Sequence, residues 1–80
     1  MVSFYSVKSK GDIGSGYEEL EVEYADSNKV VIPSVGDHIY LNDAMCEVVE
    51  VTISYNESQE DVGIEVYARP YDFTEEWQDD

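Results

Sequence analysis

Positive charge is scarce in this sequence: 4 lysines and arginines stand against 19 aspartates and glutamates, for a formal net charge of −15 over 80 residues. Such a surface repels the phosphates of nucleic acids and of anionic membranes and attracts basic proteins. We therefore expect no direct nucleic-acid or membrane binding. Solubility needs a net charge of magnitude only about 2–8 in a small domain, so the acidity indicates a further role.

Cysteine and histidine each occur once, as Cys46 and His38. A single cysteine cannot form an intrachain disulfide, which favours a reducing compartment. We interpret Cys46 as a small apolar strand residue and His38 as a solvated side chain. The sequence lacks HExxH, GxSxG, CxxC, P-loop and GxGxxG motifs, and the segments 11–16 and 56–63 do not match an EF-hand. We expect no enzyme activity, no catalytic residue, no cofactor and no metal site.

Long hydrophobic runs are also missing, so the sequence predicts no membrane-spanning segment. Residues 1–10 lack the charged start and the continuous apolar stretch of a signal peptide. We therefore expect a soluble cytoplasmic protein with one β domain over residues 1–80 and a tail over 71–80.

Alternation of apolar and polar residues dominates the chain, which is typical of strands with one buried face. It predicts strands over residues 2–7, 19–24, 29–32, 38–41, 45–55 and 62–68. In the longest strand, Cys46 and Val48 differ in parity from Val49 and Val51, which indicates a bulge near Val48–Val49 or burial of both faces. Short strands separated by frequent turns predict a small all-β barrel or sandwich, and of the two we favour a five- to six-stranded antiparallel barrel.

The segment from Pro33 to Pro70 reads VGDHIYLNDAMCEVVEVTISY, then a polar hairpin, then VGIEVYARP. It resembles the small SH3-like barrels of many phage and bacterial proteins, in which a Gly-Asp turn starts a strand and a long bent hairpin follows. The resemblance concerns the fold and implies no function. The last residues, YDFTEEWQDD, predict a short acidic tail or a helical turn capped by Thr74.

The stretch 17–24, YEELEVEY, contains four glutamates and no positive charge. Its alternation predicts an apolar core-facing set and an acidic solvent-facing set, namely Leu20, Val22 and Tyr24 against Glu19, Glu21 and Glu23. Alternate residues of a strand lie about 6.6–6.8 Å apart. Such a row is similar in spacing to the phosphates of a DNA strand, which rise about 3.4 Å per nucleotide and lie further apart because the strand winds.

Further carboxylates from later strands and the tail can extend this row, with an aromatic residue among them. The predicted partner-binding residues are Glu18, Glu19, Glu21, Glu23, Glu47, Glu50, Glu65, Asp72, Glu75, Glu76, Trp77, Asp79 and Asp80. Small size, acidity and a β-rich fold together resemble the DNA-mimic proteins, mostly phage-encoded inhibitors that occupy the nucleic-acid site of a host protein. The resemblance implies an anti-defence or host-takeover inhibitor of a basic nucleic-acid-binding protein. Pairing of two copies through an uncharged face would extend the acidic row, so the sequence leaves both a monomer and a homodimer open.

The acidity is also compatible with roles that involve no mimicry. A row of glutamates is typical of a solvated strand face, and halophilic adaptation produces acidic, lysine-poor proteins. The main alternative is a non-enzymatic structural or adaptor module, such as a small phage virion connector component. Continuous acidic ridges favour the mimic, whereas an apolar patch bordered by charge favours the adaptor. Tyr40, Tyr67 and Trp77 are the aromatic candidates for either surface.

Overall fold

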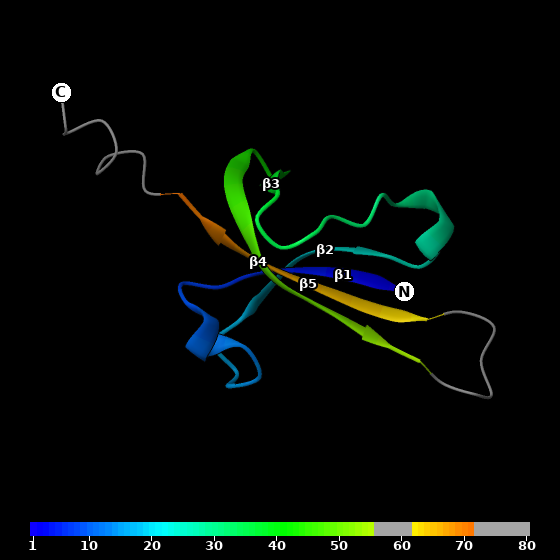
Figure 1. Ribbon diagram of the computed structural model, residues 1–80, viewed down its shortest axis with the longest axis horizontal. Helices are drawn as coiled ribbons and strands as arrows, with labels where there is room; N and C mark the ends of the chain where they lie inside the picture. The colour runs from blue at the N-terminus through cyan, green and yellow to red at the C-terminus, as the bar shows by residue number, and fades with distance from the viewer. Residues whose placement is uncertain (56–61, 72–80) are drawn as a thin grey trace, which may run out of the picture.

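The computed structural model describes residues 1–55 and 62–71, which form five strands and two short 3₁₀ helices (Figure 1). The strands are β1 Val2–Ser6, β2 Glu19–Tyr24, β3 His38–Leu41, β4 Ala44–Ser54 and β5 Gly63–Pro70. The 3₁₀ helices are η1 Lys10–Asp12 and η2 Ser27–Lys29. These elements confirm a small all-β domain.

The strands form one sheet in the order β2-β1-β5-β4-β3, which curls into a half-barrel. β1 pairs in parallel with β5, whereas the other three neighbouring pairs are antiparallel. The expectation of a wholly antiparallel barrel is therefore wrong. The parallel pair arises from the position of β1, which lies between β2 and β5 and pairs with both. The first and last described strands are therefore neighbours in the sheet.

One face of the sheet, here called the core face, carries the hydrophobic core, and the opposite face is called the outer face. The buried core residues alternate along the strands and are Val2, Phe4, Leu41, Cys46, Val48, Ile64, Val66 and Ala68. Ile39 is partly buried and packs against this cluster. Burying one such aliphatic side chain contributes about 1.5–3 kcal/mol, so this cluster is the main source of stability.

Two strands contain a bulge. In β4 the pairing with β5 shifts between Val48 and Glu50, so of the two alternatives predicted near Val48–Val49 the structure contains the bulge. In β2 the pairing with β1 shifts so that Glu21 has no direct partner, although the sequence predicted regular alternation there. As a result Val22 shares the core face with Phe4, while Leu20 is opposite Tyr5 on the outer face and is 52% exposed.

The strand predicted over residues 29–32 is wrong. Lys29 is the last residue of η2, and residues 30–32 form no ladder, although Val30 and Ile32 pack against the core and Val31 is 92% exposed. Alternating burial thus occurs here without strand pairing. Pro33 lacks an N–H for a ladder, and no described strand lies in register beside the segment.

A tight turn joins β3 to β4 at Asn42 and Asp43. Both residues have positive φ angles, 49° and 72°. Two consecutive positive φ angles are typical of the type I′ turn, whose twist matches that of the flanking strands. Asn and Asp tolerate this conformation better than other non-glycine residues. The turn brings the Asn42 side chain to Glu21 of β2.

Candidate functional site

Strand pairing determines which side chains share the outer face, because directly opposite residues of neighbouring strands point to the same side. Across the sheet from β2 to β4, one row consists of Glu23, Ser3, Glu65 and Thr52. The next row consists of Leu20, Tyr5, Tyr67 and Glu50. A third row, from β5 to β3, consists of Arg69, Glu47 and His38.

Four of the predicted partner-binding carboxylates therefore lie on the outer face: Glu23, Glu47, Glu50 and Glu65. The Ser3 hydroxyl donates to a carboxylate oxygen of Glu23 at 3.1 Å. Arg69 is the one basic residue in these three rows of described residues, and its Nη2 atom lies 3.8 Å from Glu47 Oε1. The rows therefore contain more negative than positive charge, which gives the outer face a negative potential.

The β4 bulge makes this arrangement possible. Glu47 and Glu50 differ in parity, so a regular strand would direct them to opposite faces. Because Val49 is the extra residue, Glu47 lies opposite Arg69 and Glu50 lies opposite Tyr67, both on the outer face. The bulge thus unites two carboxylates that the sequence alone would separate.

An aromatic pair lies at the centre of the outer face. The rings of Tyr5 and Tyr67 are stacked, with centroids 5.2 Å apart and an interplanar angle of 16°. Tyr67, a candidate for surface contact by its parity, is only 7% exposed and stacks on Tyr5 of the neighbouring strand. Burial, followed by the negative charge of Glu65, raises the pKa of Tyr67 to about 12. The phenol is therefore neutral at pH 7, between acidic neighbours.

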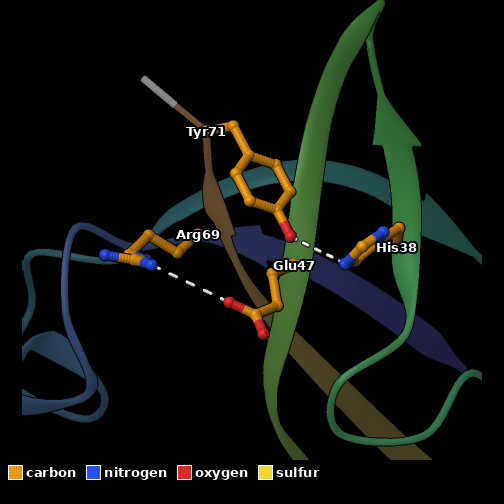
Figure 2. A network of polar contacts seen from close by, with 4 residues as sticks. All are labelled: His38, Glu47, Arg69 and Tyr71. Atoms are coloured by element: carbon orange, nitrogen blue, oxygen red, sulfur yellow. Dashed lines mark hydrogen bonds and ion pairs between the residues drawn. The ribbon is translucent and has the colours of Figure 1, made fainter. Parts of the chain in front are cut away.

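Polar contacts join three strands at one end of the outer face (Figure 2). The Tyr71 hydroxyl lies 2.7 Å from His38 Nε2, and the two rings meet edge to face at 5.4 Å. Beside them, the Arg69–Glu47 ion pair links β5 to β4. His38 is exposed as predicted, and it is held in place by Tyr71. Tyr40 of the same edge strand is 69% exposed, as its parity predicted.

Glu19 and Glu21 do not belong to the outer face, so the predicted row of Glu19, Glu21 and Glu23 is wrong. Glu19 lies opposite Ser6, whose position alternates with Tyr5 and so belongs to the core side of β1. Glu21 accepts hydrogen bonds from the Ser6 hydroxyl at 2.8 Å and from Asn42 Nδ2 at 3.0 Å. These bonds lower the pKa of the Glu21 carboxyl. The β2 bulge is the physical reason for the split.

Glu18 has a role in the loop that precedes β2. The backbone N–H of Gly14 donates to its carboxylate at 2.9 Å. Asp12 in the same loop accepts the backbone N–H of Lys8 at 3.2 Å. The charge of Glu18 is also close enough to Tyr67 to raise the pKa of that phenol. Glu18 thus orders the loop and adds to the negative field of the outer face.

Cysteine and the potential metal ligands are placed as follows in the described residues. Cys46 is buried in the core of β4, as predicted, and burial raises the pKa of its thiol. A raised pKa leaves the thiol protonated and weakly nucleophilic. Among residues 1–55 and 62–71, no group of histidine, cysteine or carboxylate side chains is arranged to hold a metal ion.

Several predicted residues lie outside the described residues: Asp72, Glu75, Glu76, Trp77, Asp79 and Asp80. Conversely, Ser3, Tyr5 and Leu20 lie on the outer face although they were not among the predicted residues. The sequence does indicate an outer position for Ser3 and Tyr5, since they alternate with the apolar Val2 and Phe4 in a predicted strand. No sequence pattern indicates an outer position for Leu20, because it has the same parity as Val22 and Tyr24, which were predicted to face the core.

Comparisons with protein-family models, curated proteins and solved structures found no match to this chain. In the part of the chain that the structure describes, no helix is both long enough and apolar enough to cross a bilayer. The geometry of the outer face is thus the main guide to function.

Proposed function

We propose that this chain is a non-enzymatic, nucleic-acid-mimicking inhibitor that acts in the cytoplasm. It occupies the DNA- or RNA-binding site of a basic protein, as phage-type host-takeover and anti-defence proteins do. The observation that carries the proposal is the gathering of Glu23, Glu47, Glu50 and Glu65 on one face of the sheet with Arg69 as the one basic residue of its rows.

The spacing of these carboxylates supports the proposal. Glu50 and Glu65 come from neighbouring strands and are offset by one alternation, because Glu50 is opposite Tyr67 and Glu65 is opposite Thr52. Such diagonal neighbours lie about 7–8 Å apart. Neighbouring phosphates of one DNA strand rise about 3.4 Å along the axis and are further apart in space because the strand winds. A basic groove can therefore contact successive carboxylates as it would contact phosphates.

The mechanism we propose has two steps. The net charge of −15 accelerates the encounter with a basic surface. Docking then brings the outer-face carboxylates against lysine and arginine side chains of the partner, while Leu20 and Tyr40, both more than half exposed, supply apolar contact. An SH3-like arrangement is the finer fold that we propose, since Gly36 and Asp37 form a turn before β3 and β4 is bulged in its middle.

The test is capture of partners from bacterial lysate at low salt with two matched triple variants. E23K/E50K/E65K reverses the outer face, whereas E19K/E57K/E60K reverses Glu19 and two glutamates outside the described residues. Each reversal adds two charges, so both variants change the net charge from −15 to −9. We expect the unchanged protein to capture a DNA- or RNA-binding protein that added DNA releases.

The outer-face variant should bind that protein at least about 10-fold more weakly, a loss of about 1.4 kcal/mol. The control variant should lose less, because its charges act mainly at long range. Equal losses in the two variants would mean that total charge, and not the outer face, determines binding. A captured protein that DNA does not release would contradict mimicry.

A second candidate, the adaptor module, is favoured by one observation. An apolar groove of about 310 Å³ opens between β2, the segment after η2 and β3, and its lining includes Val22, Tyr24, Val30, Val31 and Ile39. A Val31→Asp substitution at this exposed position should leave DNA-displaceable binding unchanged if the outer face is the site. Loss of binding in this variant, with no effect of added DNA, would favour the adaptor.

A further inference from the structure

Strand β4 has two halves with different surroundings. Residues 44–47 pair with β3, and residues 46 and 47 also pair with β5. The backbone of Val48 bonds to Gly36 and Asp37 at 2.9 Å each. Beyond the bulge, residues 50–54 pair with β5 alone among the described elements. Figure 1 shows this half of β4 as the border of the sheet, far from β3.

Hydrogen bonds on the far side of β5 reveal where the backbone groups of this border point. The N–H of Ile64 donates to the Met1 carbonyl at 2.9 Å, so Ile64 faces β1 and not β4. Its partner in β4, Ile53, is therefore in a non-hydrogen-bonded pair, and its N–H and C=O point away from β5. Val51, two residues earlier and opposite Val66, is also in a non-hydrogen-bonded pair, so its N–H and C=O likewise point away from β5.

The border thus presents the N–H and C=O groups of Val51 and Ile53 to any chain that approaches. Natural proteins protect such edges with proline, lysine or inward-pointing charges. In the segment 50–54, whose sequence is EVTIS, the one charged side chain is Glu50, which lies next to the bulge at Val49, and residues 51–54 contain no proline, lysine or other charge. An open, bondable edge of this kind is the structural requirement for addition of a partner strand.

We propose that the edge of β4 around Val51 and Ile53 binds an extended strand of the basic partner protein by β-augmentation. This inference rests on the proposed function and specifies how the partner is held. The side chains along the edge determine the chemistry of that strand. Glu50 lies on the outer face, with Glu65 in the neighbouring strand, whereas Val51 and Ile53 lie on the core side.

A complementary strand therefore alternates lysine or arginine on the outer side with apolar residues on the core side. It adds main-chain hydrogen bonds to the charge attraction and aligns the partner with the acidic outer face. A second copy of this chain is the disfavoured occupant, because two bodies of net charge −15 repel each other.

The experiment uses a synthetic peptide of alternating lysine and valine and a control peptide with the same residues in a non-alternating order. Both have the same net charge, so their difference measures strand pairing. We expect the alternating peptide to bind at least about 10-fold more tightly. Amide hydrogen exchange of Val51 and Ile53 in the unchanged protein should slow when that peptide is bound.

Ile53→Pro is the matched variant, with Ile53→Val as its control. Proline at this position removes an N–H that points away from β5, so the β4–β5 ladder is retained, and edge positions tolerate proline. The proline variant should lose the preference for the alternating peptide, and the valine variant should keep it. Circular dichroism checks that both variants are folded, and the exchange measurement needs no variant.

Equal binding of the two peptides, with unchanged exchange at Val51 and Ile53, would overturn the edge site even if DNA-displaceable capture through the outer face is observed. Slowed exchange without DNA-displaceable capture would support the edge site and contradict the proposed function. Concentration-dependent dimerisation that Ile53→Pro abolishes would show that a second copy is the occupant, and would overturn the proposal as stated.

Discussion

Strands β2 and β4 each contain one extra residue, and the two bulges have opposite effects on the acidic surface. In β4, the extra Val49 brings Glu47 and Glu50 to the outer face together. In β2, the extra Glu21 separates Glu23, on the outer face, from Glu19, on the core side. A bulge shifts every later side chain to the other face. The composition of a segment therefore does not determine the surface that its charges build.

The largest expected effect tests the face to which each bulge directs the neighbouring side chains. Sequence alternation predicts that Val51 and Leu20 both point inward, but the structure packs Val51 against the core and leaves Leu20 52% exposed. We expect Val51→Asp to lower the free energy of unfolding by about 2 kcal/mol, since it places a carboxylate without a partner at a partly buried position against the apolar core. Leu20→Asp should change it by less than about 0.5 kcal/mol.

Urea unfolding of the two variants checks this difference, with the conservative variants Val51→Ala and Leu20→Ala as controls. Similar losses for the two aspartate variants would mean that β2 is regular and that Leu20 faces the core. In that case Glu19, Glu21 and Glu23 would form the row that the sequence predicted.

How far the sequence predicts this fold depends on whether local patterns carry the information. The β4 bulge was predictable, because apolar residues occupy both parities around Val48 and Val49. The β2 bulge was not, because Leu20, Val22 and Tyr24 alternate regularly. Its determinants are remote in sequence: Ser6 in β1 and Asn42 in the β3–β4 turn both bond to Glu21.

Long-range pairing limited the other predictions as well. The parallel alignment of β1 with β5 joins residues 2–6 to residues 64–68, and no local pattern encodes it. The segment 29–32 alternates like a strand, but strand formation needs a neighbour with free hydrogen-bonding groups. Of the candidate site, Glu47, Glu50 and Glu65 were predicted by residue type, whereas their shared face required the pairing registers.

A medium effect concerns the contacts that hold the β2 bulge. Asn42 Nδ2 donates to both the Glu21 carbonyl oxygen, at 3.3 Å, and its carboxylate, at 3.0 Å. A double-mutant cycle with Glu21→Ala and Asn42→Gly should give a coupling energy of about 0.5–1 kcal/mol. Glycine retains the positive φ of 49° at this turn position.

Urea unfolding of the two single variants and the double variant measures this coupling. Additive losses would show that Asn42 does not hold the bulge. As a control, Glu23→Ala combined with Asn42→Gly should be additive, because the hydrogen bond of Glu23 is made with Ser3 instead.

The same contacts predict a pH dependence with a definite sign. Hydrogen bonds from Ser6 and then Asn42 lower the pKa of the folded Glu21 carboxyl below its value in the unfolded chain. The stabilisation is therefore fully present above the unfolded pKa and is lost as pH falls through the folded pKa. In Glu21→Gln this part of the acid-induced loss should be absent. An identical stability difference between the two proteins at neutral and acidic pH would contradict the assignment.

The smallest expected effect concerns Arg69, the one basic residue in the outer-face rows built by the β4 bulge. The Arg69–Glu47 pair is 3.8 Å long, and the two side chains are 52% and 36% exposed. Exposed pairs of this kind contribute little, so Arg69→Gln should change the free energy of unfolding by less than about 0.5 kcal/mol.

Binding of a lysine-rich peptide to the Arg69→Gln variant should strengthen by about 2–3-fold at low salt, because Glu47 loses its neighbouring cation. Lys29→Gln removes the same charge beside the apolar groove and should have less effect. Since both gains are screened by salt, a difference that persists at high salt would point to a contact of Arg69 itself and not to the field of the outer face.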